Sequence, residues 1–275
     1  MRGKKRRIEE LTRYLEEINM GKQGILVDTT DDEFSHLRDE IYKTVTALYQ
    51  TRDEAIKAKE NYADNLANIA HQLKTPITAL LLSVQMMREN PSSDNLAQIE
   101  RSAGRLQAME EALLLLSRLD SGTLCLKQEK VDVFTLLTLA FDNLQELFRA
   151  GEVQAEVLEA GEVSITADLD WTMEAVMNLV KNCMEHTPRG GCVHCSYEEN
   201  PLYVQIRIWD EGAGFAEADV FHLFDRFYRG EGEKSGGIGI GLSLAKEIIE
   251  MQRGNVSAFN LPSGGGCFEI RFYRH

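Results

Sequence analysis

The feature that most limits the fold of this chain is a long stretch, residues 31–88, with no glycine and a single proline, Pro76. Apolar side chains recur in it with a period of about seven residues, which favours helices that wind around each other. One seam line is apolar and the other is mixed, so we predict a parallel coiled coil of modest stability with a polar register. Such a coil suits either signal transmission or a plain dimerisation rod. The first line is Phe34, Ile41, Leu48, Ala55, Tyr62 and Ile69, and the second is Leu37, Thr44, Thr51, Ala58 and Asn65.

The segments on either side of this helix extend the helical part of the chain. Upstream, residues 8–34 predict a short amphipathic helix, a glycine-containing connector and a new helix start. Downstream, residues 90–94 (NPSSD) carry turn residues and a helix cap, and a second helix runs to about Asp120. The two long helices then form an antiparallel hairpin with one long apolar face, and two such hairpins make a four-helix bundle. The seam of the second helix is Ile99, Ser102, Leu106, Met109, Leu113 and Leu116.

The second half of the chain has mixed periodicity. We predict helices at residues 133–149 and 170–186, and a third that ends at about residue 252. Strands are predicted at residues 164–167, 192–197, 203–209, 255–259 and 267–273. Antiparallel strands with helices gathered on one face give an α+β sandwich.

Composition and charge exclude several classes of protein. The chain has 275 residues and a net charge of -14, and this acidity argues against general nucleic-acid binding. No apolar run approaches the ~20 residues that cross a bilayer. The basic start, MRGKKRR, either lies on the cytoplasmic side of a membrane next to a span or is simply solvated. Five irregularly spaced cysteines do not make a disulfide framework, which indicates a reducing compartment.

The pair Cys192 and Cys195 in CVHC suggests a metal site at first sight. The pair lies in a predicted strand, where residues three apart face opposite sides of the sheet. Both thiols therefore cannot reach one ion without distortion, and we expect no two-cysteine site here.

Three separate motifs in the second half favour nucleotide binding. Asn178 and Asn182 are four residues apart on a helix, so both carboxamides share one face and are suited to the oxygen shell of a divalent ion. Residues 210–215 (DEGAGF) follow a strand directly and place a carboxylate beside glycines that let a ligand approach the backbone. Residues 235–249 (SGGIGIGLSLAKEII) open a helix with glycines, which makes an anion site at its N-terminus. The spacing matches neither a P-loop nor a βαβ dinucleotide motif.

A fourth motif lies in the long helix, where residues 68–83 read NIAHQLKTPITALLLS. A proline inside a helix removes an amide donor and costs roughly 3 kcal/mol. Pro76 comes five residues after His71, which indicates that something other than helix stability is served.

Together these motifs resemble, in order, the boxes of sensor histidine kinases. His71 to Pro76 is similar to the H-box, residues 178–182 to the N-box, 210–214 to the G1-box, 224–230 (FDRFYRG) to the F-box and 236–242 to the G2-box. Residues 1–60 are similar, more loosely, to a HAMP-type linker. The resemblance implies a homodimer with a phosphorylated helical hairpin at residues 61–122 and a Bergerat-type ATP-binding α/β sandwich at residues 123–275. It also implies a response-regulator partner, the cytoplasmic side of the membrane and an anchor upstream of residue 1.

The resemblance also assigns roles to residues. His71 would accept the γ-phosphoryl group of ATP, Asn182 would hold Mg²⁺ and Asn178 would support the phosphates. Asp210 would bind the adenine amino group. Gly212 and Gly214 would shape the pocket floor, and either Arg226 or Arg229 would approach the γ-phosphate. The residues that would cradle the phosphates, beneath a lid at residues 231–236, are Gly237, Gly239, Gly241 and Leu242.

Two departures from the family pattern bear on these roles. Gln72 stands where the family has an acidic residue that orients the histidine and accepts its proton, and a carboxamide cannot act as that base. We therefore expect Gln72 mainly to fix the ring, and autophosphorylation to be slow. Glu185 stands where a basic residue is common. Thr75 matches the position used in dephosphorylating the partner, or is only the residue before a proline, and His186 either serves the triphosphate or ends a helix.

Two alternatives remain at this stage. An ATPase of the gyrase or Hsp90 kind shares the nucleotide fold but has no use for an H-box. A non-catalytic, nucleotide-binding dimeric switch is favoured by Gln72 and opposed by Asn182, Asp210 and the glycine loop. Sequence leaves open whether His71 is phosphorylated in cis or in trans.

Overall fold

The computed structural model describes residues 2–19, 35–230 and 239–274, which form two compact units, residues 1–64 and 65–275. In the first unit, helix α1 (Arg2–Asn19) contributes the buried side chain of Tyr14. Helix α2 (Ser35–Glu89) begins in this unit and buries Val45 there. The seam residues Leu48 and Tyr62 are 62% and 66% exposed in the single chain. The predicted coiled coil, which would cover them, stays a prediction, and the connector lies outside the described residues.

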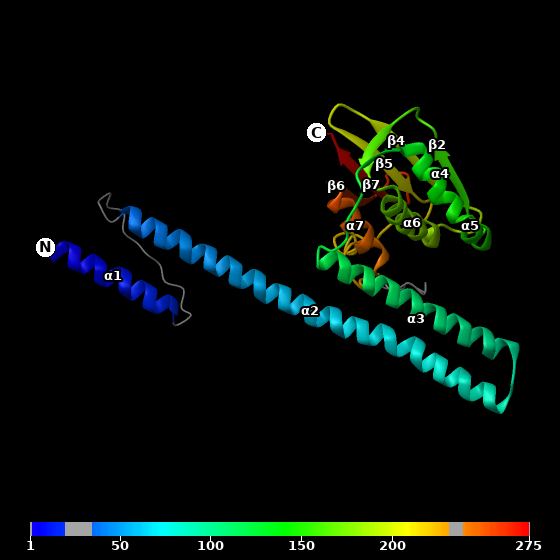
Figure 1. The fold of residues 1–275 in the computed structure, drawn as a ribbon, viewed down its shortest axis with the longest axis horizontal. Coiled ribbons are helices and arrows are strands. Elements are labelled where there is room, and N and C mark those ends of the chain that lie inside the picture. Colours follow the sequence, from blue (N-terminus) through cyan, green and yellow to red (C-terminus); the bar gives the residue numbers. More distant parts are fainter. Residues whose placement is uncertain (1, 20–34, 231–238, 275) are drawn as a thin grey trace. The chain divides into compact units, whose positions relative to one another are not determined.

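The second unit begins with the predicted hairpin. Helix α2 continues through Pro76 to Glu89, and helix α3 (Ser93–Asp120) follows after a short turn (Figure 1). The Ser92 hydroxyl caps α3 by accepting a hydrogen bond from the Asn95 amide at 3.2 Å. Along α3 the buried residues, which include Ser102, Met109 and Leu116 of the predicted seam, lie on one side. No described helix is both long enough and apolar enough to cross a membrane.

The α+β domain is built on a five-stranded sheet with the order β2-β4-β5-β7-β6. Strands β3 to β7 agree with the predicted strands, and β3 pairs separately with a short strand, β1. Two expectations were wrong: β1 and β2 were not predicted, and β2 runs parallel to β4. The reason is that β1 has only four residues and β2 is exposed along most of its length, so neither shows a clear apolar alternation. The strands are β1 (Glu129–Asp132), β2 (Gln154–Leu158), β3 (Ser164–Ala167), β4 (Cys192–Glu199), β5 (Tyr203–Trp209), β6 (Gly254–Asn260) and β7 (Gly266–Tyr273).

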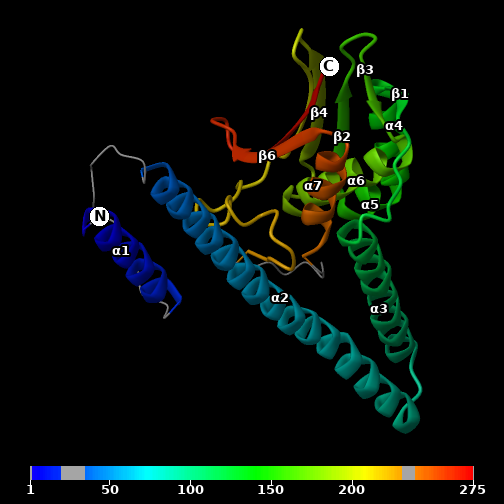
Figure 2. The same ribbon diagram turned by 60° about the vertical axis from the view of Figure 1, so that its left-hand side comes forward.

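The helices of this domain lie against one face of the sheet (Figures 1 and 2). They are α4 (Val133–Asn143), α5 (Gln145–Gly151), α6 (Leu169–His186) and α7 (Gly241–Met251). The helix predicted at residues 133–149 is therefore two helices, which meet at Leu144. Asp132 and Asp168 cap α4 and α6 by accepting backbone amide hydrogen bonds.

The two faces of the sheet differ in chemistry. On β5, Val204, Ile206 and Ile208 point into the core under the helices and are at most 1% exposed. The alternate residues point to the opposite face, which we call the outer face of the sheet. It carries ionic pairs such as Arg207 with Glu269, whose Nε and Oε2 atoms are 2.9 Å apart. Polar clusters on this outer face are thus separate from the core.

Candidate active site

A cleft of about 960 Å³ lies between α3 and the start of α7, with α6 forming another wall. Five of the sequence-predicted site residues line it: Asn178, Asn182, Gly239, Gly241 and Leu242. The remaining lining residues are Arg105, Ala108, Glu111, Ala112, Leu115, Asp170, Trp171, Glu174, Lys181, Glu185, Leu223, Tyr228, Gly230, Ile240 and Leu244.

The two asparagines share the cleft-facing side of α6, as their spacing predicted. The carboxamide nitrogen of Asn178 donates to the Glu174 backbone oxygen at 3.0 Å, which fixes the side chain along the helix. The Oδ1 atom of Asn182 is buried and has no hydrogen-bond partner among the described residues. A buried polar atom without a partner is costly, so this oxygen is a ready ligand for a cation or a water.

The glycines at the start of α7 bring the backbone close to its surroundings. Gly239 has a φ of +75°, and a Cβ atom there would lie 2.7 Å from the backbone oxygen of Tyr228. At Gly241, an added Cβ would lie 2.9 Å from Oδ1 of Asn178. The glycines therefore let the N-terminus of α7, with its outward-facing amides, approach the asparagine face of α6.

Asp210 organises the loop after β5. Its side chain is buried, and Oδ1 accepts hydrogen bonds from the amides of Gly212 at 2.8 Å and Gly266 at 3.2 Å. Burial, and secondarily the charge of Asp210, raises the pKa of the Cys183 thiol. The loop packs against the end of α6, because a Cβ atom at Gly212 would overlap the backbone oxygen of His186. Gly214 takes a φ of +78° in this loop.

Arg226 of the predicted F-box is held in an ion-pair cluster. Its Nη2 atom lies 2.6 Å from Oδ1 of Asp120, at the end of α3, and 2.7 Å from Oε1 of Glu247 on α7. The hydrogen bond with Asp120 raises the pKa of Arg226 and lowers that of Asp120. Arg226 does not line the cleft, and its predicted phosphate contact stays a prediction, as does that of Arg229. Gly237 and the lid at residues 231–236 lie outside the described residues.

His71 is exposed on α2, as a phosphoryl acceptor requires. The hydroxyl of Thr75 lies 3.4 Å from the His71 backbone oxygen, and Pro76 is buried one residue further on. The side chain of Gln72 accepts a hydrogen bond from Nη2 of Arg105 on α3 at 3.3 Å. The described hydrogen bond of Gln72 is therefore to the neighbouring helix, and its expected role in fixing the His71 ring stays untested.

Arg105 is the main cleft residue that sequence reasoning missed. It lies on α3, far from every motif in sequence, and only the hairpin brings it beside Gln72. Lys181 could have been predicted from the sequence, because it lies between the two asparagines of residues 178–182 (NLVKN). Glu185, noted as a departure from the family pattern, does line the cleft.

Comparison with known families decides the classification. The model of the His Kinase A phospho-acceptor domain matches residues 63–122, and that of the histidine kinase-, DNA gyrase B- and HSP90-like ATPases matches residues 167–274. The chain belongs to the histidine kinase family. The phospho-acceptor match contains His71, and the ATPase match contains Asn178, Asn182, Asp210 and the glycine loop.

Individual histidine kinases are similar over most of this chain. The sensor protein SphS of Synechococcus elongatus is 31% identical over 82% of this chain and 57% of its own length. The signal transduction histidine-protein kinase BaeS of Escherichia coli is 27% identical over 82% of this chain and 50% of its own. This chain thus spans little more than half the length of these relatives. The crystal structure of histidine kinase ThkA in complex with response regulator TrrA shows the same fold, with a TM-score of 0.65 at 18% identity, over 82% of this chain and 66% of that one.

Proposed function

We propose that the chain is an ATP-dependent protein-histidine kinase that phosphorylates its own His71 and passes the phosphoryl group to an aspartate of a response regulator. The division into a signalling linker (1–60), a dimerisation and phosphoacceptor hairpin (61–122) and an ATP-binding domain (123–275) is part of this proposal. The family match from residue 63 and the boundary of the compact units at residue 64 support the first division.

The observation that carries the proposal is that one side chain, Arg105 of α3, connects the cleft to the helix of His71. Arg105 lines the cleft and also hydrogen-bonds to Gln72, the immediate neighbour of His71. A triphosphate bound in the cleft would thus end near the helix turn that carries His71. Because phosphoryl transfer depends on positioning and charge stabilisation, a basic residue at this junction is well placed to orient a phosphate.

Five of the proposed nucleotide-binding residues, Asn178, Asn182, Gly239, Gly241 and Leu242, line the cleft, and the roles of the others rest on the family resemblance. Asp210 would bind the adenine amino group, and Gly212 and Gly214 would let the ring approach the backbone. Asn178, Gly239, Gly241 and Leu242 would surround the phosphates together with His186 and with Gly237. The unsatisfied Oδ1 of Asn182 fits Mg²⁺, which takes oxygen ligands and would neutralise charge on the phosphates.

The chemical step needs little from the protein beyond placement. A neutral ring nitrogen of His71 attacks the γ-phosphorus, and the bond from that phosphorus to the β,γ-bridging oxygen breaks. ADP leaves, and the ring gives up its other proton to solvent or to a neighbouring base. Gln72 cannot take this proton because a carboxamide is not a base near neutral pH. The aspartate of a receiver domain then displaces the histidine from the phosphoramidate.

A homodimer is proposed from the exposed apolar surface of the hairpin. Leu81 and Leu82 on α2 are 63% and 57% exposed, and Leu114 on α3 is also exposed. A second hairpin would cover such a face and complete a four-helix bundle. Figure 2 shows α2 leading into the turn and α3 leaving it in the opposite direction. We further propose that the protein acts on the cytoplasmic side of a membrane.

The alternatives are not favoured. An ATPase of the gyrase kind has no phosphoacceptor helix, whereas the phospho-acceptor family model matches residues 63–122. The buried Oδ1 atom of Asn182, which has no described hydrogen-bond partner and fits Mg²⁺, argues against a non-catalytic nucleotide switch.

Incubation with γ-labelled ATP and Mg²⁺ tests the proposal. We expect label that is acid-labile and alkali-stable, as a phosphoramidate is, in wild type but not in His71→Ala. His222→Ala is the matched control, because His222 is an exposed histidine outside the cleft. Acid-stable label, or label that survives His71→Ala, would contradict the proposal.

A further inference from the structure

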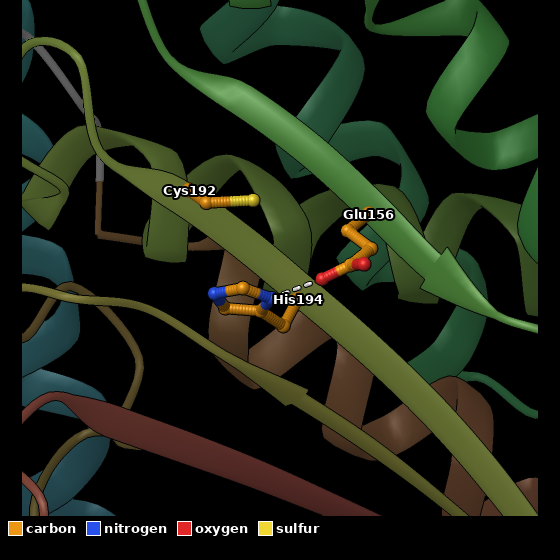
Figure 3. Close-up of side chains that lie close together, drawn as sticks. All are labelled: Glu156, Cys192 and His194. Atoms are coloured by element: carbon orange, nitrogen blue, oxygen red, sulfur yellow. Dashed lines mark hydrogen bonds and ion pairs between the residues drawn. The ribbon is translucent and has the colours of Figure 1, made fainter.

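A second group of reactive side chains lies on the outer face of the sheet, away from the core. Glu156 on β2 and His194 on β4 are direct partners in the parallel register of the two strands. Cys192 lies two residues before His194 and therefore points to the same side of β4. Figure 3 shows the three side chains converging on one point of this face, and their ligand atoms all lie within 4.8 Å of one another.

The ring of His194 is held in place before any ligand arrives. It stacks on Trp209 of the neighbouring strand, with ring centroids 5.3 Å apart. Its Nδ1 atom lies 2.9 Å from Oε2 of Glu156, and its side chain is only 20% exposed. Orientation by stacking lowers the cost of ordering the ring when a ligand binds.

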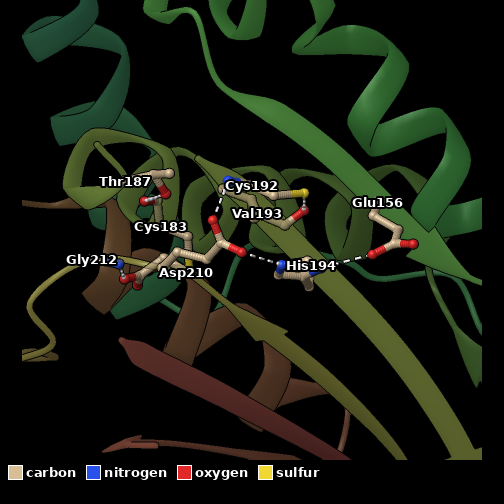
Figure 4. A network of polar contacts seen from close by, with 9 residues as sticks. Glu156, Cys183, Thr187, Cys192, Val193, His194, Asp210 and Gly212 are labelled. Atoms are coloured by element: carbon tan, nitrogen blue, oxygen red, sulfur yellow. Dashed lines mark hydrogen bonds and ion pairs between the residues drawn. The ribbon is translucent and has the colours of Figure 1, made fainter. Parts of the chain in front are cut away.

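Both ring nitrogens of His194 face carboxylates. Nε2 lies 3.2 Å from Oε1 of Glu211, and the other oxygen of Glu211 accepts a hydrogen bond from the Cys192 amide at 3.0 Å. Figure 4 shows His194 next to Glu156, with Cys192 on the same strand. A neutral imidazole donates only one hydrogen bond. In the neutral ring one nitrogen is therefore an acceptor that faces a carboxylate oxygen, and a cation bound by Nδ1 and Glu156 would remove this mismatch.

We propose that Glu156, Cys192 and His194 bind a transition-metal ion of borderline softness, Zn²⁺ foremost. A carboxylate, a thiolate and an imidazole are the three ligand types of Zn²⁺, and water would complete a tetrahedral shell. The thiolate argues against Mg²⁺ or Ca²⁺, which take oxygen ligands. Glu211 would remain on Nε2 and fix the tautomer, as a carboxylate behind a metal-bound histidine does.

The charge balance suits a divalent cation. Two carboxylates, from Glu156 and Glu211, and the thiol of Cys192 surround the His194 ring. Burial, and then the charges of Glu211 and Glu156, raises the pKa of the Cys192 thiol. The metal-free thiol is thus protonated near neutral pH, and binding of the ion releases that proton as the sulfur–metal bond forms.

The site corrects part of the sequence-based interpretation of CVHC. The expectation that Cys192 and Cys195 face opposite sides is confirmed, since Cys195 is buried in the core while Cys192 is partly exposed. The metal-ligand set was missed because Glu156 comes from β2, a strand that the sequence did not predict. Glu211 lies next to Asp210, so the proposed ion would be close in sequence to the adenine-binding loop but outside the cleft.

Titration of the nucleotide-free protein with Co²⁺, followed by competition with Zn²⁺, tests the site directly. We expect one Co²⁺ per chain with the near-ultraviolet charge-transfer band of a cobalt thiolate, which Zn²⁺ abolishes. Cys192→Ser should remove the band. His194→Gln and Glu156→Gln should keep the thiolate but weaken binding by about tenfold or more.

Two control variants match the lost side chains. Cys125→Ser removes an exposed cysteine, and His222→Gln removes a histidine whose Nδ1 atom lies 2.7 Å from Oδ2 of Asp225. Both should bind Co²⁺ as wild type does. Absence of the band in wild type, its survival in Cys192→Ser, or unchanged affinity in both His194→Gln and Glu156→Gln would overturn the proposal. Near-ultraviolet circular dichroism of the metal-free variants checks folding. Because no nucleotide is present, failure here is independent of the kinase proposal.

Discussion

The helical hairpin and the α+β domain differ in how their apolar surfaces are covered. The α+β domain buries its own core, with Leu136, Leu179, Ile206 and Ile270 all at 0% exposure. The hairpin buries Met109 of α3, and Leu116 of α3 joins the core cluster of the α+β domain, but Leu81 and Leu82 of α2 are largely exposed. A domain that completes its own core folds without help, whereas an open apolar face needs a partner. The region that carries the proposed acceptor, His71, is therefore the one whose stability we expect to depend on association.

The largest expected effect separates nucleotide chemistry from folding. Asn182→Ala removes the buried oxygen that fits Mg²⁺, and we expect autophosphorylation to fall by roughly 100-fold or more, with no loss of dimer. Asn143→Ala, at the exposed end of α4, is the control. Initial rates of label incorporation measure the effect, and a loss smaller than tenfold would remove Asn182 from the proposed ion site.

The second-largest effect concerns a residue in the closed core of the α+β domain. Ile206→Ala should lower the free energy of unfolding of the α+β domain by about 2–5 kcal/mol at every protein concentration, because it leaves a cavity in a closed core. Urea unfolding at two protein concentrations measures it. A concentration-dependent change would mean that this core, too, is completed by association.

A substitution on the exposed face of the hairpin should weaken the dimer rather than lower the stability of the α+β domain. Leu82→Glu places a charge on the exposed face, and we expect the dimer dissociation constant to rise at least about tenfold. Leu139→Glu, on an exposed part of α4, is the matched control. Sedimentation equilibrium distinguishes the two variants, and equal dissociation constants would contradict the proposed bundle.

A smaller effect concerns the departure at the acceptor. Gln72→Glu restores a base next to His71, and the rate of autophosphorylation should rise on the order of tenfold. Gln85→Glu, an exposed glutamine on the same helix, should leave the rate unchanged. If Gln72→Glu left the rate unchanged or lowered it, the hydrogen bond to Arg105 would be the main role of this residue.

The smallest effect is on the ion pair that joins the two regions. The pKa of Asp120 is lowered by the hydrogen bond with Arg226, so the folded state binds this proton less tightly than the unfolded state. The stabilisation is therefore present above the ordinary pKa of 3.8 and is lost as the pH falls below it. Because Asp120 is more than half exposed, the contribution is below about 1 kcal/mol. Urea unfolding of wild type and Asp120→Asn from pH 7 to pH 3 should give curves that converge at low pH, and a constant difference would exclude the pair.

The sequence predicts features that depend on a local pattern and misses those that depend on contacts between distant segments. A seven-residue period extends along α2 and α3, so the hairpin follows from local pattern alone. The spacing of Asn178 and Asn182 likewise placed both on one helix face. Contacts between distant segments leave no such pattern: Arg105 reaches Gln72 only across the hairpin, and Glu156 meets His194 only because β2 joins the sheet in parallel. The break at Leu144 was also hidden, because the residues on both sides of it favour a helix.

The most direct test of the proposed roles of His71 and Asn182 compares ATP binding with phosphorylation in one variant of each residue. ATP affinity and label incorporation are measured for His71→Ala and Asn182→Ala under the same Mg²⁺ conditions. We expect His71→Ala to bind Mg-ATP as tightly as wild type but to take no label, whereas Asn182→Ala should bind Mg-ATP more weakly and take little label. Label retained by His71→Ala would exclude His71 as the acceptor, and Mg-ATP affinity unchanged in Asn182→Ala would exclude Asn182 from the ion site.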